Sequence, residues 1–297
     1  MEATASLPQS STGHSSVYQI ITEQIIKQLE SGVAPWHRPW RTETPRNLVS
    51  KRDYRGINVF LLACQGYGSP FWLTYKQASE MGGHVRRGEH GSKVVFWKFD
   101  KWETEDADGQ TVERTSAILR YYTVFNVEQC EGIRAPESAR AVNPIEECER
   151  IVSAMPNRPC FEQGARAWYR PSTDSVGMPA RGSFDSSEEY YSTLFHELTH
   201  STGHPKRIGR EGIEKLNTFG SESYSKEELV AEMGAAMLAG VAGIERRTLA
   251  NSAAYLKSWI DVLRADSRMV VFAASQSQKA ADYILGKQAE AGNGGAA

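Results

Sequence analysis

The sequence contains few cysteines and no long hydrophobic segment. Its four cysteines form no Cys-x-x-Cys pair, which argues against a disulfide framework and a zinc ribbon and favours reduced thiols in the cytoplasm. No apolar run approaches the roughly 20 residues that a membrane-spanning helix needs. The first 16 residues lack the basic and apolar regions of a signal peptide. We therefore expect a cytoplasmic protein without a membrane partner, beginning with a disordered tail over residues 1–16.

The net charge of −2 is small, but the charges are unevenly distributed. Residues 31–98 contain eleven Lys or Arg against four Asp or Glu, together with ten aromatic residues. Cationic side chains can follow phosphates, and aromatic rings can stack on unpaired bases at about 1–3 kcal/mol per base. This combination predicts single-stranded DNA as the partner, because duplex DNA hides the faces of its bases.

The candidate DNA-binding side chains are aromatic residues that lie beside turns or cations, and the cations themselves. Phe60, Phe96 and Phe99 are assigned to the core instead, because aromatic residues also dominate the cores of small domains. The loop over residues 86–91 is a candidate phosphate contact, with a solvated turn as the alternative. The full candidate set is Trp36, Arg38, Trp40, Arg41, Arg52, Tyr54, Arg55, Trp72, Lys76, Arg86, Arg87 and Lys93.

The pattern of expected helices and strands predicts an α+β protein with two domains. In the N-terminal half, strands over residues 93–99 and 115–127 form a hairpin whose tip contains Asp108-Gly109. The C-terminal half is expected to be mostly helical, with a small sheet. The expected boundaries are 17–133 for a DNA-binding domain, 134–143 for a linker, 144–288 for a second domain and 289–297 for a disordered tail.

Residues 193–200 contain the pattern His-Glu-x-x-His, formed by His196, Glu197 and His200. Residues four apart lie on one face of a helix, so the two imidazoles can bind the same metal ion. Glu197 projects toward the open position of the metal, where it can take a proton from water. The pattern therefore predicts one divalent metal ion, zinc with manganese as the alternative, and Glu197 as the catalytic base. Because so short a pattern also arises by chance, the neighbouring sequence is needed to decide whether it is a metal site.

A third metal ligand is expected on a second helix, over residues 225–238. This helix carries Glu228 and Glu232 on one face. In zincins of the Glu type, the first carboxylate of such a pair binds the metal, and the second orients a ligating His from the outer shell. Glu228 and Glu232 fit those roles in that order. However, Ser225 and Glu228 also form a capping box, which would leave Glu232 as the ligand. Glu227 lies on a different face and is expected to be solvated.

Three further features surround the motif. A hairpin of short extended segments is expected over residues 167–178, and in zincins an edge strand at this point pairs with the peptide substrate. Tyr224, just before the second helix, is a candidate for stabilising the transition state at a scissile carbonyl. His204 is a further candidate ligand, although it lies between Gly203 and Pro205.

Several segments in both halves carry a family resemblance. In the second half they are Met178-Pro179, residues 193–203 and the helix over residues 227–238. In the first half they are Gly32-Val33-Ala34-Pro35-Trp36, Tyr54-Arg55-Gly56-Ile57-Asn58, Trp72-Leu73-Thr74-Tyr75-Lys76-Gln77-Ala78, Gly91-Ser92-Lys93-Val94-Val95 and Tyr122-Thr123-Val124-Phe125-Asn126-Val127. With these segments the chain resembles, over nearly its whole length, the ArdC-type antirestriction proteins of conjugative plasmids.

The resemblance implies an N-terminal single-stranded DNA-binding domain and a C-terminal metallopeptidase-like domain of the zincin type. It also implies entry into a recipient cell with transferred DNA and protection of that DNA from restriction, with a host restriction-system protein as a candidate target. Two alternatives stay open. One is a DNA-binding protein whose metal site is structural or vestigial, and the other is a zinc nuclease.

Overall fold

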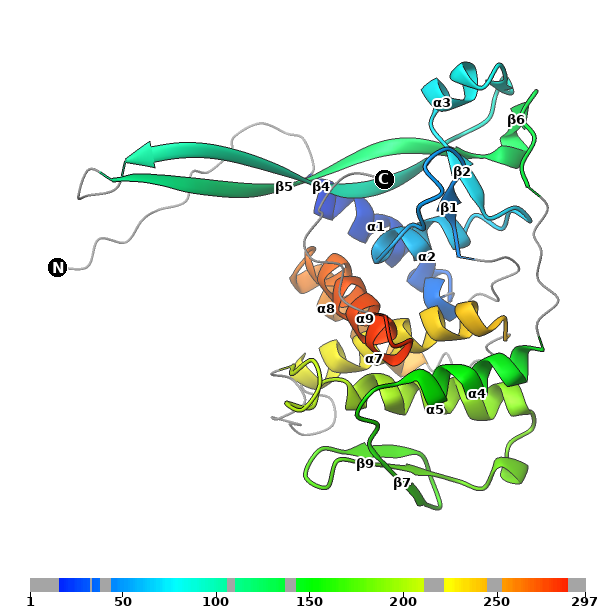
Figure 1. Ribbon diagram of the computed structural model, residues 1–297, viewed down its shortest axis with the longest axis vertical. Coiled ribbons are helices and arrows are strands. Elements are labelled where there is room, and N and C mark those ends of the chain that lie inside the picture. The colour runs from blue at the N-terminus through cyan, green and yellow to red at the C-terminus, as the bar shows by residue number, and fades with distance from the viewer. Residues whose placement is uncertain are drawn as a thin grey trace.

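The computed structural model describes residues 16–32, 34–37, 44–105, 110–136, 143–210, 222–244 and 253–287. It is an α+β protein, as predicted, with a long hairpin in its N-terminal part and a mostly helical C-terminal part (Figure 1). The predicted tail over residues 289–297, all but residue 16 of the predicted N-terminal tail, and the hairpin tip at Asp108-Gly109 lie outside the described residues. None of the described helices combines the length and hydrophobicity needed to cross a membrane.

The N-terminal part opens with helix α1, Val17–Glu30. A capping box between Ser16 and Gln19 fixes its start, because each side chain accepts a hydrogen bond from the other's backbone N–H. The helix then buries one apolar stripe against the rest of the protein. That stripe consists of Ile21, Ile25 and Leu29.

Three short helical segments follow, η1 (Pro35–His37), α2 (Ile57–Ala63) and α3 (Tyr75–Glu80). A capping box formed by Thr74 and Gln77 is present at the start of α3. Gln77 N–H donates to Thr74 Oγ1 at 3.2 Å, and Thr74 N–H donates to Gln77 Oε1 at 2.8 Å. This helix ends at the glycine pair Gly82-Gly83, where Gly82 adopts a φ of +80°.

A four-stranded sheet of order β1-β2-β5-β4 organises the N-terminal part. Strands β4 and β5 are paired from Ser92↔Val124 out to Glu105↔Thr111. Because β1 and β2 are short, most of this pair extends beyond the sheet (Figure 1). We call residues 92–105 of β4 and 111–124 of β5 the arm. The bounds are β1 Arg46–Asn47, β2 Phe71–Leu73, β4 Ser92–Glu105 and β5 Thr111–Asn126, and a separate pair joins β3 (His84–Val85) to β6 (Cys130–Glu131).

The arm is longer than the predicted hairpin, and one residue of it that was assigned to the core is exposed. Phe99, expected in the core, is 47% exposed because it lies where the ribbon has left the body of the protein. Phe60 is fully buried, as expected. Phe96 is half-buried and packs against the ring of Tyr122 at 5.4 Å.

The C-terminal part places a small sheet beside a group of helices. Strand β9 (Ser175–Met178) pairs with β8 (Trp168–Arg170) in the expected antiparallel hairpin. Strand β7 (Cys160–Gln163), which was not predicted, pairs with β9 in parallel on its other side. Strand β9 is therefore central, and β7 and β8 form the edges. The other elements are α4 (Pro144–Ala154), η3 (Arg181–Ser183), α5 (Ser187–Ser201), α7 (Glu222–Ala242), α8 (Ala253–Ala265) and α9 (Met269–Ile284).

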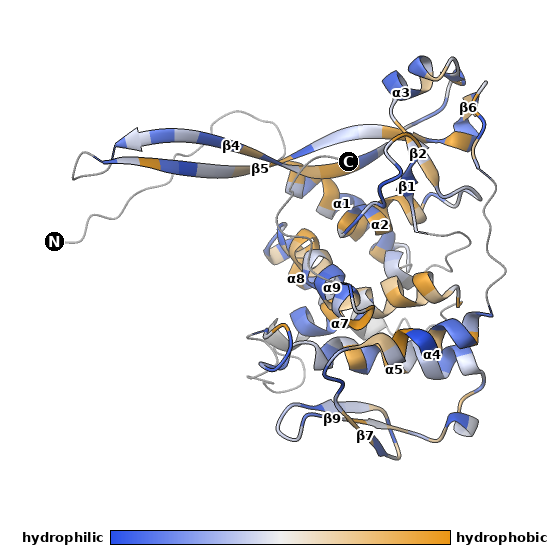
Figure 2. Cartoon of the chain, in the orientation of Figure 1, coloured by the Kyte–Doolittle hydropathy of each residue, from blue (hydrophilic) through white to orange (hydrophobic). Residues whose placement is uncertain are grey.

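One large hydrophobic core joins the two parts of the chain. It contains the apolar stripe of α1 and residues of α2 as well as the packed faces of α5, α7, α8 and α9. Figure 2 shows hydrophobic residues concentrated along α7, which lies between the other helices. Trp36 of η1 contacts Trp259 of α8 edge-on, with ring centroids 5.3 Å apart. Arg55 also forms an ion pair with Asp282 of α9, so the N-terminal part is fixed against the helices that follow.

Candidate metal centre

Helix α5 carries the two histidines of the His-Glu-x-x-His pattern. Its start is capped by Ser186, whose Oγ accepts a hydrogen bond from the N–H of Glu189 at 3.1 Å. Leu194 and Leu198 face the core, and this orientation fixes which side of the helix turns toward α7. His196 and His200, one turn apart, therefore face the same neighbouring helix.

Helix α7 presents Glu228 to both histidines. The Nε2 atoms of His196 and His200 lie 3.1 Å apart. Glu228 Oε2 lies 3.5 Å from Nε2 of His196, and Glu228 Oε1 lies 3.4 Å from Nε2 of His200. A tetrahedral zinc ion with bonds of about 2.0–2.1 Å needs ligand atoms separated by roughly 3.3 Å. The three side chains therefore fit one divalent metal ion in their present positions.

The structure separates Glu228 from the cap that could have used its carboxylate. Helix α7 begins at Glu222, so Ser225 lies inside the helix and not at its start. Ser225 Oγ instead lies 2.8 Å from Oγ of Ser258 on α8. With no cap at Ser225, Glu228 is available to the two histidines.

Glu232 lies on the outer side of the first histidine. Its Oε1 is 3.3 Å from Nδ1 of His196, the ring nitrogen that faces away from His200. A carboxylate at this position can accept a hydrogen bond from Nδ1–H and fix the ring so that Nε2 points at the metal. This is the outer position that the spacing from Glu228 predicts.

Glu227 was expected to be solvated, but the structure buries it. It is 5% exposed, and its Oε1 lies 3.3 Å from Nδ1 of His200. Each histidine thus has its own carboxylate behind it, Glu232 for His196 and Glu227 for His200. The sequence signal that could have revealed this is the Glu227-Glu228 pair, because adjacent helical residues diverge by about 100° and can approach the two nitrogens of one ring from different sides.

The buried charge of Glu227 is balanced by Arg210. The guanidinium binds both carboxylate oxygens, with N–O distances of 2.5 and 3.1 Å. It also donates to Thr202 Oγ1 at 2.6 Å and to the carbonyl of Thr199 at 2.9 Å. Arg210 therefore connects the end of α5 to α7 through a cluster of buried polar groups. Arg210 was not predicted from the sequence, because it lies outside both predicted helices.

The electrostatics of the cluster follow from this packing. Burial lowers the pKa of His200, but hydrogen bonds to Glu227 and Glu228 outweigh burial and raise that pKa to about 9. Burial likewise lowers the pKa of His196, and hydrogen bonds to Glu228 and Glu232 raise it well above its ordinary value. Burial raises the pKa of Glu228, whereas hydrogen bonds to both histidines hold it far below the usual range. The pocket therefore favours cations next to its carboxylates.

The other predicted residues near the motif have different positions. Glu197 is half-buried and so keeps some access to solvent. His204 turns away from the ligand set, with Nδ1 3.9 Å from a carboxylate oxygen of Asp174. Tyr224 lies in the first turn of α7, and its side chain is outside the described part of the chain.

Three of the aromatic residues that were predicted to stack on DNA are buried instead. Trp36, Tyr54 and Trp72 are buried, with at most 2% exposure. Each lies next to turn or basic residues in the sequence, but packing against distant elements covers it. Trp36 joins the large core, and Tyr54 and Trp72 share a smaller core with Val94 and Val124 of the arm's base.

The predicted cations are mostly at the surface. Arg52, Lys76 and Arg87 are exposed, and Lys93 is half-buried. Arg55 is held by Asp282, as described above, and Arg86 pairs with Glu89 of its own loop at 2.6 Å. Lys76 forms an exposed pair with Glu80 at 3.6 Å. Arg38, Trp40 and Arg41 lie outside the described residues.

Comparison with known proteins identifies both parts of the chain. Residues 146–276 match the family of zincin-like metallopeptidases, and residues 15–125 match the N-terminal domain of the anti-restriction factor ArdC. The fold and the site together define a two-domain protein whose second domain is a zincin-like metallopeptidase domain. The chain belongs to the ArdC antirestriction family.

Solved structures and curated relatives agree with this assignment. The metal-free crystal structure of the antirestriction protein ArdC from plasmid R388 is 38% identical, with a TM-score of 0.73, and the match covers 90% of this chain and 96% of that one. Its Mn(II)-bound structure is 36% identical, with a TM-score of 0.71, and the match covers 91% and 97% of the two chains.

Two curated sequences are also similar to this chain, one of about the same length and one much longer. The protein y4eC of Sinorhizobium fredii is 33% identical over 96% of this chain and 95% of its own length. DNA primase TraC of Escherichia coli is 38% identical over 90% of this chain, but the match covers only 20% of TraC. The chain thus spans about a fifth of that primase.

Proposed function

We propose that this protein binds single-stranded DNA and protects incoming plasmid DNA from restriction, and that it carries a metal-dependent peptide-hydrolysing site. The observation that carries the second half of the proposal is the cluster of His196, His200 and Glu228 between α5 and α7, in which each Nε2 atom lies within 3.5 Å of an oxygen of Glu228 and the two Nε2 atoms lie 3.1 Å apart. Family membership supports the first half. We place this activity in the cytoplasm, including that of the recipient cell, with a host restriction-system protein as the peptide target.

The donor set bears on the identity of the metal. Two imidazoles and one carboxylate suit Zn²⁺, and Mn²⁺ accepts the same donors with a stronger preference for oxygen. The Mn(II)-bound ArdC of plasmid R388 supports manganese as the alternative. When bound, either ion supplies a Lewis acid that polarises a peptide carbonyl and makes water more acidic.

The residues of the chain then have distinct tasks. Glu197 takes a proton from the attacking water and passes it to the leaving amine. Glu232 and Glu227 accept hydrogen bonds from the Nδ1 atoms of His196 and His200, which holds both rings in place. We propose that Tyr224 donates a hydrogen bond to the oxygen of the scissile carbonyl.

The test compares Glu197→Gln with wild type in the presence of metal. We expect loss of peptide hydrolysis, unchanged metal content and an affinity for single-stranded oligonucleotides within a factor of about three of wild type, because the substitution keeps the size of the side chain. Glu188→Gln, in the first turn of the same helix, is the matched control and should keep full activity. Loss of oligonucleotide binding in Glu197→Gln would refute the separation of the two activities.

The same variant distinguishes the alternative functions in a conjugation assay with a restricting recipient. Loss of protection by Glu197→Gln supports proteolysis. Full protection by that variant would instead assign a structural role to the metal, and His196→Ala with His200→Ala should then mainly lower the melting temperature. Degradation of oligonucleotides that a chelator abolishes would indicate a nuclease.

A further inference from the structure

Among the described residues, four of the seven exposed aromatic side chains lie on the arm, and the other three, Tyr75, Phe161 and Phe272, lie on separate elements. Trp97, Phe99 and Trp102 of β4 and Tyr121 of β5 are each between 40% and 47% exposed. By contrast, Trp36, Tyr54 and Trp72 are buried, so they cannot offer a face to a ligand. Among the described residues, β4 and β5 therefore carry the largest group of rings that could stack on bases.

Three of these four rings lie on the same face of the ribbon. In an antiparallel pair, directly opposed residues share a face, and so do alternate residues of each strand. Trp97 and Phe99 are two apart in β4, and Tyr121 lies opposite Val95, the preceding alternate position. We call Trp97, Phe99 and Tyr121 the aromatic face of the arm. Trp102 lies on the other face, opposite Arg114.

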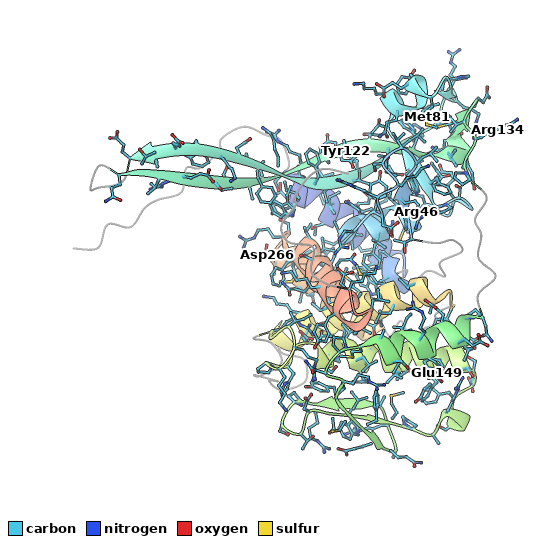
Figure 3. The ribbon with its side chains drawn as sticks, in the orientation of Figure 1. Arg46, Met81, Tyr122, Arg134, Glu149 and Asp266 are labelled. Carbon is cyan, nitrogen blue, oxygen red and sulfur yellow. The ribbon has the colours of Figure 1, made fainter. Side chains whose placement is uncertain are left out.

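The position of the aromatic face is fixed by the core at its base. Val95 and Leu119, on the same face, are buried in the large core. Trp97 touches the ring of Tyr18 on α1, with centroids 6.3 Å apart, and Phe99 lies one step farther out. Figure 3 labels Tyr122 near the point where the arm meets the body, and side chains project from both faces beyond it. The rings thus lie at the body end of the arm, next to residues that are packed in the core.

Charge differs between the two halves of the arm. The half nearer the body, residues 92–101 and 115–124, contains four basic residues, Lys93, Lys98, Lys101 and Arg120, against the single acid Asp100. Residues 102–114 contain five acids against Arg114 alone. The half that carries the aromatic face therefore attracts a polyanion, and the outer half repels it.

Two of the lysines lie at the ends of the aromatic face. Lys93 Nζ lies 5.4 Å from the centre of the Tyr121 ring, and Lys101 pairs with Glu113 at 2.7 Å. Both lysines are on the same face as the rings, because Lys93 and Lys101 are separated from Trp97 and Phe99 by even numbers of residues along β4. The pair formed by Lys101 is exposed, with 64% and 59% of the two side chains accessible, so it can exchange for a phosphate at little cost.

We infer that the aromatic face is the binding surface for single-stranded nucleic acid. Unpaired bases stack on Trp97, Phe99 and Tyr121, while Lys93 and Lys101, on the same face, contact phosphates. A duplex is a poor ligand because its base faces are covered. This inference rests on the proposed function, and it adds the surface that performs the DNA binding.

The test measures affinity for a labelled oligothymidylate of about 15 nucleotides, within the range of known single-strand site sizes. Phe99→Ala with Tyr121→Ala should weaken binding at least ten-fold, because each stacked base contributes about 1–3 kcal/mol. Phe99→Trp should retain binding. Trp102→Ala, which removes an equally exposed ring from the opposite face, should stay within two-fold of wild type.

Several outcomes would overturn the inference. Unchanged affinity in the double variant refutes the aromatic face while leaving DNA binding by this protein intact. An equal loss in Trp102→Ala also refutes the assignment to one face. If wild type binds no oligonucleotide, the proposed DNA-binding function falls as well. Loss of antirestriction with unchanged DNA affinity would show that the face binds a protein instead. Lys93→Gln adds a second readout, because removing a phosphate contact should reduce the slope of log affinity against log salt by about one.

Discussion

Replacing Arg210 with methionine should destabilise the protein severely, although Arg210 touches no proposed metal ligand. Its side chain is 8% exposed and that of its partner Glu227 is 6% exposed. Arg210→Met leaves the Glu227 carboxylate buried without its cation. Removing one partner of a buried ion pair typically costs about 3–5 kcal/mol in the free energy of unfolding. That loss is a large fraction of the roughly 5–15 kcal/mol that stabilises a typical domain.

The magnitude can be separated from general effects of mutation. Lys257→Met removes a cation from the exposed pair with Asp261 on α8, where the side chains are 77% and 56% accessible. Because solvent screens such a pair, the free energy of unfolding should change by only about 0.5 kcal/mol or less. Urea unfolding of the two variants, monitored by circular dichroism with metal removed by a chelator, gives the comparison directly.

A double variant tests the physical cause. Glu227→Gln removes the buried negative charge and keeps an oxygen that can accept a hydrogen bond from His200. Combined with Arg210→Met, it should recover part of the lost stability, because no uncompensated charge then remains in the cluster. A cost of less than about 1 kcal/mol for Arg210→Met, or additivity of the two changes, would contradict an unpaired buried charge as the cause. Metal affinity provides a second measurement, since loss of such an outer contact typically weakens binding by roughly 10- to 100-fold.

Two further predictions concern the contact between α5 and α7 and its response to pH. A Cβ at Gly234 would lie 2.5 Å from Cγ2 of Thr199, so Gly234→Ala should separate the helices, lower the melting temperature and weaken metal binding. Gly182→Ala, whose Cβ would meet nothing within 4 Å, should change neither, and a normal melting temperature for Gly234→Ala would contradict the close approach. In the metal-free protein, despite burial, carboxylate contacts raise the pKa of His200 to about 9, so its contribution to stability should be present below pH 6.5 and lost as the pH rises to about 9. Metal affinity should increase over the same interval, because protons compete less, and calorimetry in buffers of different ionisation enthalpy should show proton release on binding.

Local sequence was sufficient wherever the relevant geometry is local. The spacing of His196 and His200 fixes a shared helical face before any tertiary contact forms. The capping box at Thr74 and Gln77 is also local, and the structure contains it. The α+β class followed for the same reason, because helical and strand periodicities are properties of short segments.

The sequence could not locate the side chains whose burial depends on distant partners. Trp36 and Tyr54 lie among turn and basic residues, yet Trp36 packs against Trp259, more than two hundred residues later. Glu227 was expected in solvent, because a helix projection cannot show that Arg210, from outside the helix, forms a buried ion pair with it. The exposure of the rings on the arm was also not predicted, because the sequence does not show that β4 continues past the edge of the sheet.

The sequence by itself therefore determined the His-Glu-x-x-His motif, the fold class and the basic and aromatic character of the first half. Tertiary structure decided which carboxylate joins the two histidines in the candidate metal centre, because only the packing of α7 against α5 brings Glu228 within 3.5 Å of both Nε2 atoms. It also decided which aromatic residues are accessible. Chemistry at one position depends on residue type and short spacing, whereas burial depends on which distant segments the fold places around it.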